Sequence, residues 1–204
     1  MDDIKAAPPD HVQLYEIASE QHGYFTAAQA RACGVSWKLL SHHAHSGRFI
    51  RVRRGLYRFR DYPSSSHEEV VEAWLATGKD VAVVSHESAL ELLGLSNVIP
   101  NAVHLTVPRS KRHLPDLPGV TIHTTTRPLD SGDVVTRDGI RLTSATRSIL
   151  DSAETGTSPE QIELAIRQSL DRGLTTPRHL DAAARERSRR VRDLVSDALR
   201  FVGG

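Results

Sequence analysis

The chain has little of what several classes of protein depend on. It contains one cysteine, Cys33, among 204 residues. A single cysteine excludes an internal disulfide framework and a cysteine-based zinc site, and it fits a reducing compartment. No apolar run approaches the roughly 18 residues of a membrane helix, and the opening MDDIKAAPPDH lacks the apolar core of a signal peptide. We therefore expect a cytoplasmic protein with no membrane partner.

The chain also lacks a net charge large enough to indicate a partner. It has 26 Lys and Arg against 25 Asp and Glu, which gives a net charge of +1. A hydrophobic content of 39% and a charged content of 25% are those of an ordinary globular protein with one large or two small domains. Any sign of nucleic-acid binding must therefore come from how the charges are distributed along the chain.

Acidic residues are missing from one long stretch, residues 31–60. All the charged residues there are basic: Arg31, Lys38, Arg48, Arg51, Arg53, Arg54, Arg58 and Arg60. In a nearly neutral chain, this segregation produces a strongly positive region that favours an anionic partner. The alternative is a solvated strand edge whose arginines discourage strand-to-strand aggregation.

Three helix patterns precede and enter this basic stretch. Asp10, Thr26 and Ser36 each stand where a side chain can cap the first turn of a helix. A glycine follows each pattern at the point where a helix would end: Gly23, Gly34 and Gly47. Two short helices joined by a turn that contains glycine are typical of a helix-turn-helix.

After Gly47 the hydrophobic period changes from about 3.6 residues to 2. In RFIRVRRGLYRFR, arginines alternate on both sides of a Gly55 turn with apolar residues: Ile50, Val52, Tyr57 and Phe59. This pattern predicts a β-hairpin with one apolar and one arginine face. Helices followed by a basic hairpin predict a winged helix-turn-helix over residues 1–62, in which the hairpin is the wing.

The predicted recognition helix runs from Trp37 to Ser46 and turns Leu40 and Ala44 inward. Its outward side chains are candidate readers of bases in the major groove: Trp37, Lys38, Ser41, His42 and His45. The arginines that follow are candidate contacts to phosphates or to the minor groove: Arg48, Arg51, Arg53, Arg54 and Arg58. His43 falls where an apolar residue is expected, so we predict that it is half buried and reads no base.

A change of composition at YPSSSHEEVVEAW places the domain boundary after residue 62. Residues 63–204 then carry helix patterns, three strand-like stretches and further helix patterns, in that order. The strand-like stretches are NAVHLTV, GVTIHTTT and DVVTRDGIRLT, and Asp138 with Gly139 suits a hairpin turn in the last one. The predicted fold class is therefore α+β: an N-terminal winged helix-turn-helix and a mixed α/β C-terminal domain that ends in helices.

Motifs for catalysis and for cofactors are missing. The chain has no glycine-rich phosphate loop and no HExxH. Ser85, His86 and Glu87 are consecutive at a helix start and cannot align as nucleophile, base and orienting acid, so we interpret Ser85 as an N-cap. His42 and His45 lie three residues apart but lack a third ligand nearby. We therefore predict a protein that is not an enzyme, with no catalytic residue, metal or cofactor.

Three blocks of sequence, in the expected order, resemble the AbiEi family of type IV antitoxins and transcriptional regulators. They are GYFTAAQARACGVSWKLLSHHAHSGRFIRVRRGLYRF, VSHESALELLGL, and DGIRLTSATRSILDSA followed by a helix and GLTTPRHLDAA. The resemblance implies an antitoxin paired with a nucleotidyltransferase toxin of the AbiEii kind. In this family the winged helix binds inverted repeats in its own promoter and represses the operon, while the C-terminal domain is needed to neutralise the toxin. The implied partners are operator DNA, on which the chain could be a homodimer, and the cognate toxin.

Two other functions stay open. The first is a stand-alone winged-helix transcription factor whose C-terminal domain binds a ligand or dimerises. The second is a nuclease, because related chains with a SHESALELLGL-like block continue into a very-short-patch-repair-like endonuclease domain. We expect no such domain here, since the sequence ends at Gly204 and shows no clustered Asp, Glu and Lys of that nuclease type.

Overall fold

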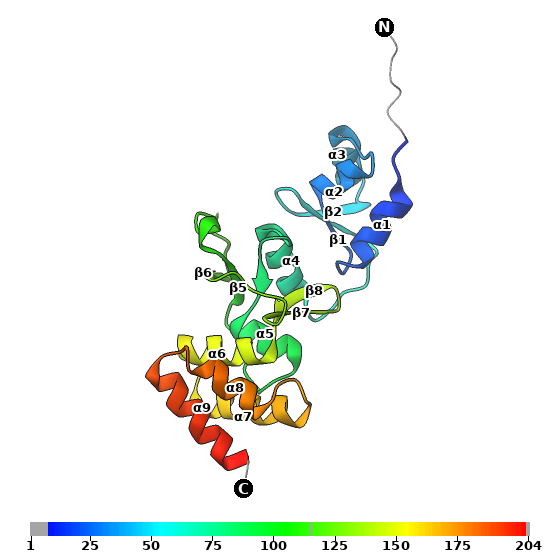
Figure 1. Cartoon of the computed structure of the whole chain (residues 1–204). Coiled ribbons are helices and arrows are strands. Elements are labelled where there is room, and N and C mark those ends of the chain that lie inside the picture. Colours follow the sequence, from blue (N-terminus) through cyan, green and yellow to red (C-terminus); the bar gives the residue numbers. More distant parts are fainter. Residues whose placement is uncertain (1–7, 115, 203–204) are drawn as a thin grey trace. The chain divides into compact units, whose positions relative to one another are not determined.

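The computed structural model describes residues 8–114 and 116–202 (Figure 1). The chain divides into two compact units, which are described separately. Unit 1 comprises residues 1–79 with 138–140, and unit 2 comprises residues 80–137 with 141–204. Within the described ranges, no helix combines the length and the apolar character needed to cross a membrane.

Unit 1 is a winged helix-turn-helix followed by one further helix. Its elements are α1 (His11–Ser19), β1 (Tyr24–Thr26), α2 (Ala27–Ala32), α3 (Trp37–His45), β2 (Phe49–Arg53), β3 (Leu56–Phe59) and α4 (Glu68–Thr77). The strands form an antiparallel sheet in the order β1-β3-β2. Strand β1 was not predicted, because three residues between a glycine and a helix cap are too few to show a period of two.

The three predicted helix caps are confirmed. The Asp10 side chain accepts a hydrogen bond from the Gln13 backbone N–H (2.8 Å), and Ser36 Oγ accepts one from the Leu39 N–H (3.2 Å). Thr26 forms a reciprocal capping box with Gln29 at the start of α2. These bonds satisfy donors that the helix itself leaves unpaired, and they set the first residue of α3 at Trp37.

An aromatic cluster forms the core of unit 1. The ring of Phe25, in β1, is fully buried and lies 4.9 Å from Phe49, 5.9 Å from Tyr57 and 5.2 Å from Phe59, measured between ring centroids. Leu40 of α3 is also fully buried and belongs to the same cluster. The recognition helix and the hairpin are therefore held by one shared core.

The hairpin does not have the two distinct faces that its alternating sequence predicts. Strand β3 is the central strand of the sheet, and all its residues are buried, whereas Ile50 in β2 is 37% exposed. A bulge shifts the pairing register between Arg51 and Arg53. An extra residue in one strand breaks the period of two, so alternation in the sequence fails to predict which side chains face outward.

Helix α4 belongs to unit 1, because it packs against β1 and β3. The units therefore divide after Lys79, whereas the change of composition placed the domain boundary after residue 62. The change of composition correctly marks the Pro/Ser stretch between β3 and α4. It does not predict that α4 packs back onto the hairpin.

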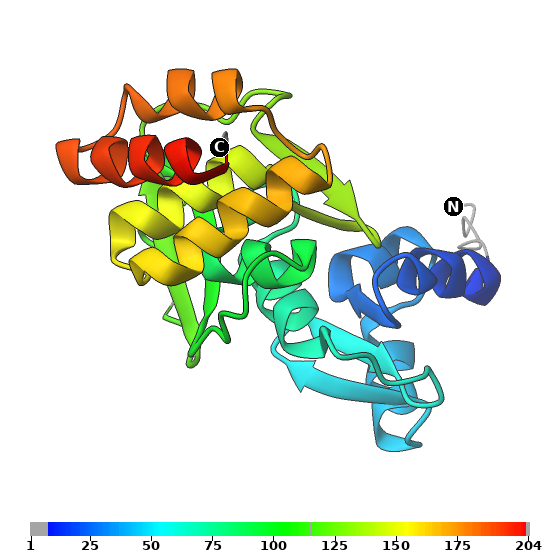
Figure 2. The same cartoon turned by 90° about the horizontal axis from the view of Figure 1, so that it is seen from below.

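Unit 2 is a mixed sheet with a group of helices. From residue 80 the elements are β4 (Val83–Val84), α5 (His86–Leu93), β5 (Val103–Pro108), the 3-10 helix η1 (Arg109–Lys111), β6 (Val120–Thr125), β7 (Val134–Arg137), β8 (Ile140–Thr143), α6 (Ala145–Thr155), α7 (Pro159–Asp171), α8 (Pro177–Ala184) and α9 (Arg189–Val202). The strand order is β6-β5-β4-β8-β7, with β4 antiparallel to β5 and parallel to β8. Helices α6 to α9 pack together (Figure 2).

The sequence predicted most of these elements. The three strand-like stretches are strands, and the turn at Asp138 and Gly139 has φ of 49° and 77°, as a tight hairpin turn requires. Together with the winged helix of unit 1, they confirm the predicted α+β fold class.

Candidate nucleic-acid interface

The recognition helix presents the side chains that the sequence assigned to base reading. Trp37, Lys38, Ser41, His42 and His45 are all exposed on α3. On the opposite side Leu40 is fully buried, and Ala44 packs against the core of unit 1. Both sides of the helix therefore have the orientation expected from the sequence.

His43 is half buried, as predicted. Its ring lies 5.0 Å from the ring of Phe49. Burial lowers the pKa of His43, and the nearby charge of Arg48 lowers it further. This histidine is part of the packing between α3 and β2.

The hydrogen bonds of His45 fix its tautomer. Its Nδ1 lies 2.8 Å from the backbone carbonyl oxygen of Ser41. Because a carbonyl oxygen can only accept, Nδ1 carries the proton, and in the neutral ring Nε2 keeps its lone pair. His45 can therefore accept a hydrogen bond from an exocyclic amino group of adenine or cytosine.

Trp37 stands at the start of α3 and is 55% exposed. The guanidinium of Arg31, on α2, lies 5.5 Å from its ring centroid, in a cation–π arrangement. Sequence reasoning counted Arg31 among the basic residues but did not assign it to the interface. The side-by-side placement of α2 and α3 adds this exposed cation to the recognition helix.

The wing supplies three exposed arginines: Arg48, Arg51 and Arg54. Within the described ranges, none of the three forms an ion pair with a carboxylate. Helix α3 packs against β2, so these cations lie beside the recognition helix. Long guanidinium groups without a carboxylate partner, next to a recognition helix, are suited to bind phosphates.

Arg58 does not belong to this surface, although the sequence assigned it to the interface. It is 7% exposed, its guanidinium forms an ion pair with Glu68 of α4 (2.9 Å), and the same nitrogen donates to the carbonyl oxygens of Tyr62 and Pro63. Because β3 is the central strand, the side chain points into the packing under α4 instead of toward solvent. Arg58 is therefore a structural residue that attaches α4 to the sheet.

Arg53 also differs from expectation. Its Nε donates to the carboxylate of Glu72, again on α4, and the arginine side chain is 33% exposed. Removing it from Glu72 costs an existing ion pair, so Arg53 is a weaker candidate for a phosphate contact than Arg51 or Arg54. The carboxylates of both ion pairs, Glu68 and Glu72, lie on the acidic helix α4. The change of composition had assigned this helix to the C-terminal domain, so the sequence did not predict either pair.

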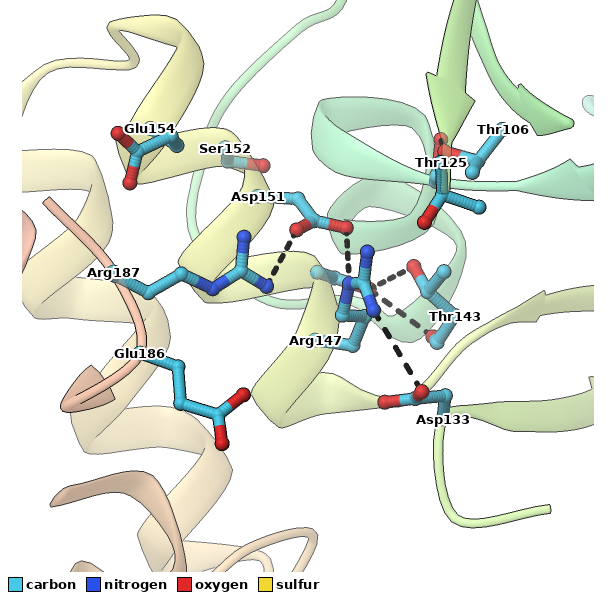
Figure 3. Close-up of polar contacts among 12 residues, drawn as sticks. Thr106, Thr125, Asp133, Thr143, Arg147, Asp151, Ser152, Glu154, Glu186 and Arg187 are labelled. Atoms are coloured by element: carbon cyan, nitrogen blue, oxygen red, sulfur yellow. Dashed lines mark hydrogen bonds and ion pairs between the residues drawn. The ribbon is translucent and has the colours of Figure 1, made fainter. Parts of the chain in front are cut away.

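Unit 2 contains a second cluster of charged residues (Figure 3). The carboxylate of Asp151 on α6 is buried and binds two arginines, Arg147 one turn earlier and Arg187 before α9, each at 2.7 Å. Arg147 also lies 3.6 Å from the carboxylate of Asp133. Since every charge here has a partner, the cluster fastens α6 to the segments before β7 and α9.

Ser85 does not cap α5, although it occupies the N-cap position. Its side chain makes no cap hydrogen bond. Instead, Ser85 Oγ accepts a hydrogen bond from Thr106 Oγ1 (2.8 Å) and lies 2.8 Å from Nδ1 of His86.

Comparisons with known proteins agree with the geometry of unit 1. Residues 12–60 match the family described as transcriptional regulator, AbiEi antitoxin, which confirms the resemblance over that region. The chain is also similar in fold to the RV2827C protein from Mycobacterium tuberculosis, whose crystal structure aligns with a TM-score of 0.62 at 13% identity, over 94% of this chain and 76% of that one. A comparison with curated proteins found no match. The matched segment contains α3 and the wing.

Proposed function

We propose that this chain is a DNA-binding antitoxin that represses its own operon through α3 and the wing. One observation carries the proposal. In a stretch without any acidic residue, the structure leaves the following cations exposed around the recognition helix: Arg31, Lys38, Arg48, Arg51 and Arg54. The family match over residues 12–60 supports the same function.

The proposal involves two kinds of contact with DNA. The wing arginines bind phosphates, which supplies salt-dependent affinity for any DNA sequence. The polar side chains of α3 read base edges in the major groove, which supplies preference for inverted repeats in the promoter. No covalent chemistry is needed for this function, so the proposal describes a regulator and not an enzyme.

The direct test is a salt titration of the full chain on the DNA upstream of its own gene, with a scrambled duplex of equal length and composition. Trp37 is exposed and the other tryptophan, Trp74, is 3% exposed, so a Trp74→Phe variant reports binding through Trp37 fluorescence alone. We expect quenching of Trp37, a steep salt dependence on both duplexes and tighter binding to the natural one. Equal affinity for the two duplexes would refute the operator-binding proposal.

A prediction for the recognition helix follows. Lys38→Ala or Ser41→Ala should weaken binding to the operator by about 1 to 3 kcal/mol, the range of a good base contact, and change binding to the scrambled duplex much less. Lys111→Ala is the matched control for Lys38, because Lys111 is exposed in unit 2. Unchanged discrimination between the duplexes in both α3 variants would exclude these side chains as base readers.

The second half of the proposal is that the chain counteracts a cognate nucleotidyltransferase toxin. The first step is to look for a nucleotidyltransferase gene next to the gene of this chain. The test is then coexpression with that nucleotidyltransferase, with growth as the measurement. We expect growth to be restored by the wild-type chain and also by a variant that no longer binds DNA. If growth is restored only by chains that bind DNA, the chain acts only by repression. If the wild-type chain does not restore growth, it is not an antitoxin.

A stand-alone transcription factor that senses a ligand is the second candidate, and a cavity in unit 2 favours it. The cavity has a volume of about 730 Å³, and its lining includes Arg127, Arg147, His179 and Glu186. That volume is within the usual range for small-molecule sites. Two results together would favour this function over the antitoxin. A small polar molecule would change the affinity of the chain for the operator, and the chain would fail to restore growth in the coexpression test.

A further inference from the structure

Three histidines that are far apart in the sequence meet in unit 2. His86 begins α5, His104 lies in β5 and His123 lies in β6. One ring nitrogen from each lies within 4.8 Å of the other two. The sequence alone did not indicate this cluster, because its members are separated by strands and loops of irregular length and share no metal-binding motif.

The closest pair is His104 and His123 on the neighbouring parallel strands β5 and β6. Nδ1 of His104 lies 2.9 Å from Nε2 of His123, and the two ring planes differ by 14°. A hydrogen bond here uses one ring proton. In either tautomer Nε2 of His104 stays buried without a hydrogen-bond partner among the described residues. A buried polar atom without a partner is costly and needs an explanation.

His86 is held by neighbours that orient one of its nitrogens. Ser85 Oγ accepts a hydrogen bond from Thr106 Oγ1 and lies 2.8 Å from Nδ1 of His86. A second lone pair of Ser85 Oγ can accept from an N–H at Nδ1. With the proton on Nδ1, the lone pair of His86 is on Nε2.

The burial of the cluster keeps its rings neutral. Desolvation lowers the pKa of His86 to about 2 and that of His123 to about 4, and it also lowers the pKa of His104. The adjacent cavity, about 220 Å³, is lined by two arginines and two carboxylates, whose charges balance: Arg147, Arg187, Asp151 and Glu154.

We propose that His86, His104 and His123 form a binding site for a divalent transition-metal ion, with Zn²⁺ as the preferred ion. Imidazole nitrogen suits Zn²⁺, Ni²⁺ and Cu²⁺, whereas Mg²⁺ and Ca²⁺ prefer oxygen. Three protein ligands would leave a fourth position of a tetrahedral site for water. The ion would join α5 to β5 and β6. This inference concerns unit 2 alone and does not depend on DNA binding.

One side chain has to move for the ion to bind. The ring of His86 stacks on that of His123, with centroids 3.6 Å apart and planes at 17°. Since lone pairs lie in the ring plane, stacked rings cannot both point at one ion. The His86 ring must turn about its Cβ–Cγ bond, which gives up the contact between its Nδ1 and Ser85 Oγ. The facing nitrogens of His104 and His123 are already 2.9 Å apart, and an ion there takes the place of the proton between them, so these two histidines are the ones to replace first.

The experiment titrates the full metal-free chain with Co²⁺, a spectroscopic substitute for Zn²⁺, and follows the visible ligand-field bands. We expect one ion per chain and displacement by Zn²⁺. In His104→Gln with His123→Gln the affinity should fall at least about tenfold, because even outer partners of metal ligands are worth 10 to 100-fold. The matched control is His113→Gln with His179→Gln, which removes two exposed histidines from unit 2 and should leave binding unchanged.

Equal Co²⁺ affinity in the wild type and the His104/His123 variant would overturn the proposal, as would loss of binding in the control. A second measurement covers the case in which the variant folds poorly. Zn²⁺ at about 100 times its Kd should raise the melting temperature of the wild type by several degrees, and a chelator should reverse the rise. A wild-type chain whose melting temperature does not respond to Zn²⁺ would refute the site without any variant.

Discussion

Replacing Arg48, Arg51 and Arg54 together by alanine is expected to weaken DNA binding by about two to three orders of magnitude at 0.1 M salt, for operator and scrambled DNA alike. The three side chains are exposed cations of the wing without a carboxylate partner among the described residues. Each phosphate contact releases condensed counterions and contributes about 0.9 to the slope of log K against log salt concentration. Losing three contacts should therefore reduce that slope by about 2.7.

A variant with the same change of charge serves as the control. Arg185, Arg189 and Arg200 lie in unit 2, and their side chains are 75%, 86% and 74% exposed. Replacing these three by alanine lowers the net charge equally but should leave the slope unchanged. If both triple variants lose affinity to the same extent, the effect is one of net charge, and the wing is not the phosphate-binding surface.

The second large effect concerns stability. Asp151→Asn should lower the free energy of unfolding by about 3 kcal/mol, the lower end of the range for breaking a buried ion pair. The substitution keeps the size of the side chain but removes the charge that Arg147 and Arg187 share (Figure 3). Asp133 still compensates Arg147. Arg187 is left without a carboxylate partner among the described residues, which is why the cost is large but not maximal.

Urea denaturation measures this loss as a shift of the midpoint at constant slope. Asp181→Asn is the control, because Asp181 also pairs with an arginine one turn away, Arg185, but both side chains are exposed. An exposed pair contributes about 0 to 1 kcal/mol, so this variant should unfold nearly as the wild type does. Equal stability of the two variants would show that burial adds nothing to the Asp151 cluster.

Much of unit 1 could be predicted from the sequence because its signals are local. A cap such as Ser36 acts within one turn, and the period of α3 places Leu40 inside and Lys38 outside through helix geometry alone. The absence of acidic residues from 31–60 is likewise a property of the sequence. These features were enough to predict a winged helix and the exposed side chains of its recognition helix.

Tertiary structure decided which arginines are available. Arg51 and Arg58 are equivalent in the sequence pattern, yet β3 became the central strand and α4 folded onto it, which buried Arg58 beside Glu68. The pairing of β1 with β3 and the contact of α4 with the hairpin both join segments that no local period connects. Long-range contacts of this kind, and not the residue type, separate structural arginines from binding ones.

By itself, then, the sequence determined the helices, the basic hairpin and the charge that an anionic partner would meet. Only the tertiary structure brought together Asp151 with Arg187 and His86 with His104 and His123, because each group joins elements separated by long stretches of chain. Local propensity and hydrophobic period act over a few residues. Burial, ion pairing and converging ring nitrogens exist only once the strands and helices of unit 2 have packed.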